Sequence, residues 1–164
     1  MKTIVMTLLM VYDHPRILLA MKKRDFGKGR WNGFGGKVLP GETIQEAARR
    51  EALEEGGIVI DNMEKMGVIQ FAFENKVQLK ELETKQVEVH IFHVKSFSGS
   101  LVETEEMKPQ WFHIDEVPYH EMWPDDKYWL PLFLAGKKFT GRFLFDHADN
   151  TKILDSELNI VAEL

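Results

Sequence analysis

The stretch from Gly35 to Ile58 constrains this chain most, because it combines clear helix boundaries with an acidic stripe where apolar side chains are expected. Thr43 and Glu46 have the spacing of a capping box, and Gly56-Gly57 supplies a C-terminal stop. We therefore predict a helix over residues 43–56.

A 3.6-residue period places five side chains of this helix on one stripe, with Glu54 at its edge: Ile44, Ala47, Ala48, Glu51 and Glu55. Leu53 faces nearly the opposite way, which predicts apolar contacts on two sides of the helix.

The acids have two interpretations. A solvated acidic face is the usual meaning of a charge run. However, acids near a helix C-terminus oppose the macrodipole by roughly 0.3–1 kcal/mol each. Glu51 and Glu55 also form an unfavourable like-charge i,i+4 pair. Several local rules broken together indicate a functional site. Three carboxylates within one helical turn suit a hard cation, Mg²⁺ or Mn²⁺.

Length and composition narrow the class of protein. The 164 residues predict one domain spanning 1–164, and the net charge of −5 argues against broad nucleic-acid binding. The chain has no cysteine, which excludes disulfides and thiol chemistry and fits the cytoplasm. The apolar run Met1–Tyr12 is too short to span a bilayer, and a turn rather than a cleavage site follows it. We read this run as a buried strand.

Strand patterns outnumber helix patterns. Met1–Tyr12 and Ile17–Lys22 read as a hairpin, and Phe26–Gly36 as a glycine-rich loop. Further strands are expected over Val68–Phe73, Val87–Val94 and Phe139–Phe145, with a short strand over Gln110–Ile114. A second helix is expected over residues 125–136. Glu74–Gln86 reads as a long exposed hairpin loop, and Ile153–Leu164 is ambiguous. This pattern favours an α+β fold, a mixed sheet with helices packed on it.

The acidic helix resembles the signature motif of the Nudix hydrolase family. Gly36 is followed after five residues by Glu42, and after seven more by Arg50 and the run to Ile58. Every fixed polar position of the motif is present, and Ala52 is a mild departure at an aliphatic position. The resemblance implies a Nudix fold, a mixed β-sheet between helices with a loop–helix–loop metal site. It also implies hydrolysis of a nucleoside diphosphate linked to another group.

The resemblance implies roles for particular residues. The metal ligands would be Glu51, Glu54, Glu55, the Gly35 carbonyl and Glu106. Arg50, grouped with the three helix glutamates in the catalytic set, resembles the arginine that braces the loop, and Glu42 resembles a supporting acid. Lys37 either touches phosphate or is a surface lysine, and Glu106 taken alone would be a solvated loop acid.

Outside the motif, the chain is similar to the MutT-related hydrolases of oxidised purine nucleoside triphosphates. The similarity runs through Met21–Arg24, Gly29–Lys37, Glu105–Pro109 and Met122–Asp126. It implies a base pocket formed by Thr7, Lys22, Phe26, Asn32, Phe71, Phe73, Trp123, Asp125 and Asp126.

Simpler interpretations stand beside some of these residues. Pro124-Asp125-Asp126 is also a good helix start, with proline at the first helical position. Phe71 and Phe73 lie two apart on a strand and are more often core than pocket residues, and Thr7 can satisfy its hydroxyl locally. If Asp125 and Asp126 are buried together they can share a proton, and such a pair could read two different oxidised bases.

The expected function is Mg²⁺-dependent hydrolysis of oxidised purine (deoxy)nucleoside triphosphates, such as 8-oxo-dGTP and 2-oxo-dATP, to the monophosphate and pyrophosphate. The alternatives are a Nudix enzyme for another nucleotide and a nucleotide-binding protein without catalysis. Asp25 beside Phe26 and the length of Glu74–Gln86 depart from the resembling enzymes and bear on the choice of base. We expect a cytoplasmic monomer that acts on a small nucleotide, with no nucleic-acid polymer or membrane as partner.

Overall fold

The computed structural model describes residues 3–74 and 86–164. Two α-helices lie in this part of the chain, α1 (Ile44–Gly56) and α2 (Asp126–Leu134). The longer strands are β1 (Thr3–Asp13), β2 (Arg16–Lys22), β5 (Glu64–Glu74), β6 (Gln86–Val94), β8 (Met107–His113), β9 (Lys138–Asp146) and β10 (Ile153–Val161). The short elements are β3 (Trp31–Asn32), β4 (Ile58–Val59), β7 (Ser98–Gly99) and two 3-10 helices, Ile114–Glu116 and Tyr119–Glu121.

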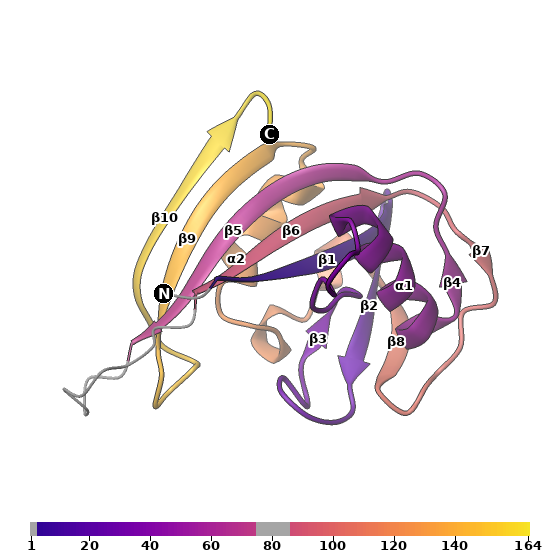
Figure 1. Ribbon diagram of the computed structural model, residues 1–164, viewed down its shortest axis with the longest axis horizontal. Helices are drawn as coiled ribbons and strands as arrows, with labels where there is room; N and C mark the ends of the chain where they lie inside the picture. The colour runs from indigo at the N-terminus through magenta and orange to yellow at the C-terminus, as the bar shows by residue number, and fades with distance from the viewer. Residues whose placement is uncertain (1–2, 75–85) are drawn as a thin grey trace.

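One mixed sheet organises the described residues. Its eight strands run in the order β10-β9-β5-β6-β1-β2-β3, with β8 paired to the other edge of β2 (Figure 1). β1 pairs with β6 and β5 pairs with β9 in parallel, and the remaining pairs of this sheet are antiparallel. β4 and β7 form a separate two-stranded sheet.

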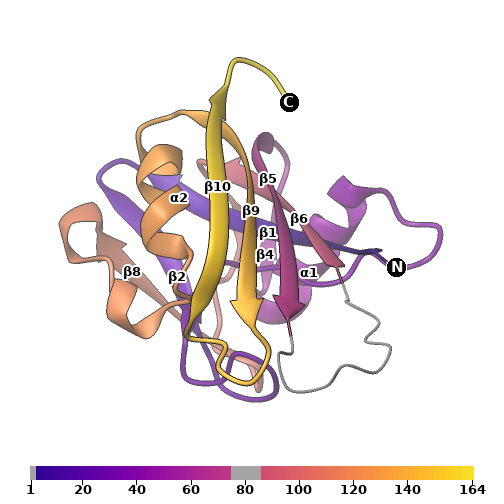
Figure 2. The same cartoon turned by 90° about the vertical axis from the view of Figure 1, so that its left-hand side faces the viewer.

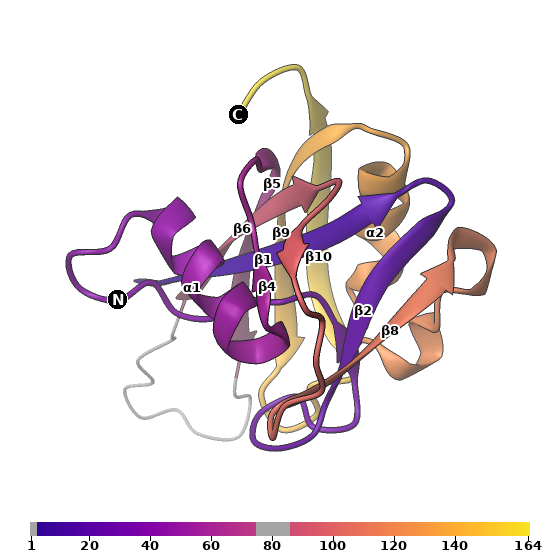
Figure 3. The same ribbon diagram turned by 90° about the vertical axis from the view of Figure 1, so that its right-hand side faces the viewer.

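The two helices cover opposite faces of the large sheet. α2 lies beside β10 and β9 in Figure 2, with α1 behind the sheet, whereas α1 is in front in the opposite view of Figure 3. The side chains confirm this arrangement, because Leu9 and Val11 of β1 pack with α1 while Met10, between them, packs with α2. The fold is the predicted α+β arrangement, a mixed sheet between two helices.

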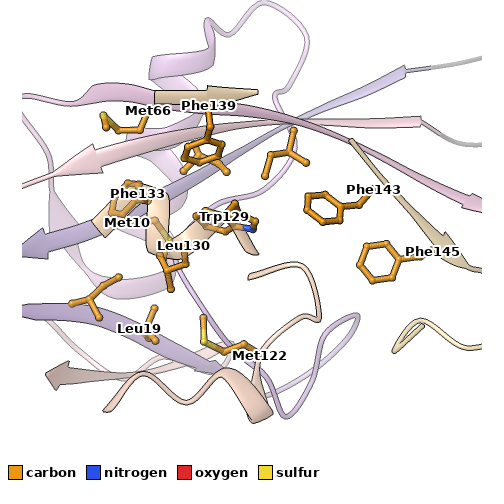
Figure 4. Close-up of a cluster of buried hydrophobic side chains, with 13 residues drawn as sticks. Met10, Leu19, Met66, Met122, Trp129, Leu130, Phe133, Phe139, Phe143 and Phe145 are labelled. Atoms are coloured by element: carbon orange, nitrogen blue, oxygen red, sulfur yellow. The ribbon is translucent and has the colours of Figure 1, made fainter. Parts of the chain in front are cut away.

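The core beneath α2 is strongly aromatic (Figure 4). Trp129 and Phe133 of the helix pack with Phe139 and Phe143 of β9, and each of these side chains is at most 2% exposed. Trp129 stacks on Phe139 with 5.8 Å between ring centroids. This packing fixes the first turn of α2, and with it Asp125 and Asp126, against the sheet.

The start and end of α1 follow from its capping residues. The Thr43 hydroxyl accepts the Glu46 N–H and the Glu46 carboxylate accepts the Thr43 N–H, which completes the predicted capping box. Gly57 ends the helix in the left-handed conformation at φ 71°. The prediction of a second apolar side is wrong, because Leu53 is 54% exposed. Only the alanine-rich stripe packs on the sheet, so Leu53 lies on the solvent side.

Most predicted elements are present, and most of the strands are longer than predicted, whereas α2 ends at Leu134 rather than at residue 136. The hairpin of β1 and β2 is confirmed, with Val11 opposite Leu18. β8 begins at Met107 rather than Gln110, because its pairing with Lys22 of β2 extends it. The ambiguous C-terminal segment forms β10 against β9. The central part of the predicted Glu74–Gln86 loop lies outside the described residues.

Pro124 does not occupy the first helical position. α2 begins at Asp126 with Asp125 as its N-cap residue, so Pro124 precedes the cap. The Asp125 side chain makes no capping hydrogen bond. The sequence pattern therefore locates the helix start correctly but assigns the wrong positions to its residues.

Neither helix in the described part of the chain has the length and apolar character that a membrane crossing needs.

Candidate active site

The glycine-rich loop before α1 is hydrogen-bonded along β1. The Thr7 N–H donates to the Gly36 carbonyl at 2.9 Å, and Leu9 exchanges two backbone hydrogen bonds with Phe34. A Cβ atom on Gly35 would lie 1.8 Å from the Thr7 carbonyl oxygen, far inside contact distance. Only glycine allows this close approach of backbone to backbone, so the loop is held at the end of the acidic helix.

Glu55 is the buried carboxylate of this helix. Its side chain is 3% exposed, and its Oε1 accepts the Gly35 N–H at 2.8 Å. Burial raises the pKa of Glu55 to about 8, opposed by the hydrogen bond from Gly35. The charges of Glu51 and Glu106 raise this pKa further, whereas Lys22 lowers it. Three predicted metal ligands are therefore close enough for their charges to act on one another.

Arg50 connects the loop to the helix. Its guanidinium donates to both Glu42 carboxylate oxygens, at 2.7 and 3.0 Å, and to the Lys37 carbonyl at 3.0 Å. It also donates to Glu51 at 2.9 Å and Glu54 at 3.2 Å. The hydrogen bond from Arg50 holds the pKa of Glu42 below its usual value. These are the contacts that a brace between loop and helix requires.

The remaining predicted residues of this region lie at its surface. Glu54 is exposed, and the Lys37 side chain is exposed while its backbone contacts Arg50. Glu106 is half-buried and pairs with Arg24 at 3.1 Å. In residues 3–74 and 86–164, no three carboxylate or histidine side chains are arranged as a metal-binding group.

The donor set nevertheless fits a hard divalent cation. Carboxylate oxygens are the ligands that Mg²⁺ and Mn²⁺ prefer. The Glu51 carboxylate packs against Gly36 of the loop, because a Cβ atom added to Gly36 would lie 2.5 Å from Glu51 Oε1. This carboxylate therefore lies next to the loop backbone. A cation beside Glu55 would also offset the mutual repulsion that raises its pKa.

A cavity of about 250 Å³ lies next to this loop. The structure places all nine residues of the predicted base pocket on its wall: Thr7, Lys22, Phe26, Asn32, Phe71, Phe73, Trp123, Asp125 and Asp126. Gly35 and Glu55 also line it. One continuous space therefore joins the aromatic side chains to the acidic helix.

The cavity has an aromatic wall with one open side. Phe26 is 69% exposed and lies 5.0 Å from Trp123, centroid to centroid. Phe71 and Phe73 are half-buried and stack on Phe143 and Phe145 of β9. These two phenylalanines belong to the core and to the cavity wall at once, so the two interpretations from sequence are compatible.

Asp125 and Asp126 are buried together. Each is 3% exposed, and the Trp129 indole N–H donates to Asp125 at 2.8 Å. Asp126 Oδ2 is buried without a hydrogen-bond partner among the described residues. Burial raises the pKa of both, and the charge of Asp125 raises the pKa of Asp126 further. Burial of both carboxyl groups therefore favours a shared proton in the pair, more strongly at Asp126 than at Asp125, to which Trp129 donates.

Arg30 belongs to the cavity wall and was not predicted from the sequence. Its guanidinium carbon lies 3.8 Å from the centroid of the Trp123 ring. Arg30 stands next to Trp31 in the glycine-rich loop, but Trp123 is far away in the chain. A contact between residues so distant leaves no local signal in a single sequence.

Carboxylates on a loop–helix–loop beside an aromatic cavity are an arrangement suited to a hydrolase that acts on a phosphorylated aromatic ligand. Residues 1–133 match the NUDIX domain, and the chain belongs to this family of hydrolases. Nudix hydrolases generally need divalent cations.

Two relatives are similar over most of their length. The chain is 50% identical over 143 residues to the oxidized purine nucleoside triphosphate hydrolase of Mus musculus, with 87% of each chain covered. It is 47% identical over 159 residues to the protein of the same name from Danio rerio, with 97% of this chain and 96% of the relative covered. A solved structure of the MutT protein from Bacillus halodurans is 26% identical, with a TM-score of 0.81, and the match covers 95% of this chain and 97% of that one.

Proposed function

We propose that this chain is a single Nudix domain, residues 1–164, that hydrolyses oxidised purine (deoxy)nucleoside triphosphates such as 8-oxo-dGTP and 2-oxo-dATP. The products would be the monophosphate and pyrophosphate. The names of the mouse and zebrafish relatives support this substrate class. The observation that carries the proposal is the cavity itself, where the predicted base-binding residues meet the buried carboxylate of Glu55.

The cavity offers a purine both stacking and hydrogen bonding. Trp123 provides a flat aromatic face. The Asn32 side-chain oxygen accepts the Gly33 N–H at 2.9 Å, which leaves the Asn32 amide group to donate to a base edge. A neutral Asp126 donates where an ionised carboxylate would accept. A change of protonation within the aspartate pair would therefore allow two oxidised bases with different edges to bind.

The phosphates would lie at the acidic end of the cavity. There Glu51, Glu54, Glu55, Glu106 and the Gly35 carbonyl would hold Mg²⁺, or Mn²⁺ in its place. The bound cation supplies charge neutralisation, polarises phosphorus and activates water. Arg50 keeps the loop and helix in register through Glu42 and Lys37, and the Lys37 side chain remains available for a phosphate.

The surroundings of the enzyme follow from the same proposal. The substrate is a small nucleotide, so neither a nucleic-acid polymer nor a membrane is needed as a partner. We expect a cytoplasmic monomer that removes damaged nucleotides from the precursor pool.

Turnover with Mg²⁺ over a panel of nucleotides tests the proposal. The panel contains oxidised, methylated and unmodified purine triphosphates, a nucleotide sugar and a dinucleotide, with pyrophosphate and phosphate measured separately. We expect the highest kcat/KM for an oxidised purine triphosphate and release of pyrophosphate. Preference for the nucleotide sugar would contradict the assignment of the base pocket, and no turnover of any compound would favour a binding protein.

A further inference from the structure

Arg30 lies against the aromatic ring of Trp123 in the cavity wall. Its guanidinium carbon is 3.8 Å from the Trp123 ring centroid, which is within stacking distance. Its Nη2 donates to the side-chain oxygen of Asn150 at 3.2 Å. Arg30 therefore occupies the position from which the orientation of Trp123 can be set.

The backbone of Arg30 is fixed on both sides. Its N–H donates to the Gly27 carbonyl at 3.1 Å, and its carbonyl accepts the Lys22 N–H at 3.0 Å. Gly27 and Gly29 have φ of 89° and 86°, a conformation that favours glycine. The turn therefore presents the arginine side chain from a defined point beside Trp123.

Asn150 comes from a distant part of the chain. It lies in the connection between β9 and β10, the two strands at one edge of the large sheet. Its hydrogen bond is a link between this connection and the glycine-rich loop. A planar guanidinium held at one nitrogen by an amide oxygen loses freedom to rotate away from the indole.

The charge of Arg30 also acts on the aspartate pair. Arg30 is half-buried, and burial lowers its pKa while Asp126 and Asp125 oppose this change. In return, the positive charge of Arg30 lowers the pKa of both carboxyl groups. A second explanation of its role is therefore purely electrostatic, and an experiment must separate charge from stacking.

We propose that Arg30, held by Asn150, is a positioning residue that fixes the indole plane of Trp123 for stacking with the purine. The connection between β9 and β10 then takes part in base selection without touching the base. This inference rests on the proposed function, because it concerns how the same cavity binds its substrate.

Three variants separate the contributions. Arg30→Met keeps an unbranched apolar stem but removes the charge, the plane and the bond to Asn150. Arg30→Lys keeps the charge alone, and Asn150→Ala keeps the stacked guanidinium but removes its anchor. Arg142→Met is the matched control, since Arg142 belongs to β9 and pairs with Asp155 and Glu157 of β10, away from the cavity.

Kinetics with 8-oxo-dGTP give the first readout. Loss of a partly desolvated cation–π contact predicts a KM about tenfold higher for Arg30→Met, with kcat within about twofold of wild type. Arg30→Lys should fall between wild type and Arg30→Met, and Asn150→Ala should raise KM about threefold, the size of a weak hydrogen bond. Arg142→Met should leave KM unchanged. A KM in Arg30→Lys equal to that of wild type would overturn the stacking role in favour of charge alone.

The second readout observes the indole directly. In protein labelled with 5-fluorotryptophan, the Trp123 ¹⁹F resonance is identified by its loss in Trp123→Phe. We expect this resonance to shift and broaden in Arg30→Met and, to a smaller extent, in Asn150→Ala, while the Trp129 resonance stays in place. An unmoved Trp123 resonance in both variants would overturn the proposal.

The two readouts keep the outcomes distinct. If wild type does not hydrolyse oxidised purine triphosphates, the proposed function fails, but the ¹⁹F spectra still decide whether Arg30 orients Trp123. If wild type is active and KM is unchanged in every variant, only the positioning role fails. If Arg30→Met does not fold, Arg30→Lys and Asn150→Ala give the same decision.

Discussion

Replacing Asp126 with asparagine changes how the stability of the protein depends on pH. Asp126 is 3% exposed, and one of its oxygens is buried without a partner in the described part of the chain. Burial and the neighbouring charge of Asp125 raise its pKa well above the usual value. Asparagine has nearly the same shape and cannot titrate, so Asp126→Asn isolates the effect of this proton.

The sign follows from proton binding in the two states. Unfolded aspartate titrates near about pH 3.9. Above that pH and below the raised folded pKa, the folded chain keeps a proton that the unfolded chain has released. The free energy of unfolding therefore falls as pH rises, by about 1.4 kcal/mol per pH unit for one group. Asp126→Asn should remove this slope, while the slope that Glu55 contributes below its pKa of about 8 remains in both proteins.

Urea unfolding at several pH values between about 5 and 6.5, with a chelator present, measures the slope. The expected difference between wild type and Asp126→Asn is about 1.4 kcal/mol per pH unit. Asp61→Asn is the control, because Asp61 is exposed. Identical slopes for wild type and Asp126→Asn would refute a neutral, buried Asp126.

Three further predictions concern the acidic helix. Glu55→Gln should lower kcat at least about tenfold with the melting temperature retained, since it removes a catalytic-site charge and keeps the shape; steady-state kinetics and thermal melts check this. Gly36→Ala should weaken Mg²⁺ activation about tenfold by displacing the Glu51 carboxylate, which lies 2.5 Å from the added Cβ, and an Mg²⁺ titration of activity measures it. Arg50→Lys should cost about 1–3 kcal/mol in urea unfolding, because lysine cannot bridge Glu42 and the loop carbonyl together.

Local signals in the sequence predicted local structure well. The capping box at Thr43 and the glycine stop at Gly57 define α1 without help from the rest of the chain. The hairpin of β1 and β2 is equally local. In contrast, Leu53 was assigned an apolar contact that the fold does not provide, and β8 was predicted too short. Both errors depend on which distant element packs against a segment, and periodicity does not contain that information.

The candidate site shows the same division. The resemblance named nine residues for the base pocket, and the structure brings all nine around one cavity. It could not supply Arg30 or Asn150, whose positions depend on contacts with Trp123 and with each other across the fold. The burial of Asp126 also became visible only in three dimensions, because two adjacent acids at a helix start are ordinarily solvated.

The central claim is that this cavity selects an oxidised purine. A competition experiment tests it most directly: equal concentrations of 8-oxo-dGTP and dGTP in one reaction with Mg²⁺, with consumption of each followed by chromatography. The ratio of the initial rates equals the ratio of the two kcat/KM values. We predict faster consumption of 8-oxo-dGTP by at least about tenfold, the size of one well-placed hydrogen bond to a base edge. Equal consumption of the two nucleotides, or faster loss of dGTP, would contradict the account.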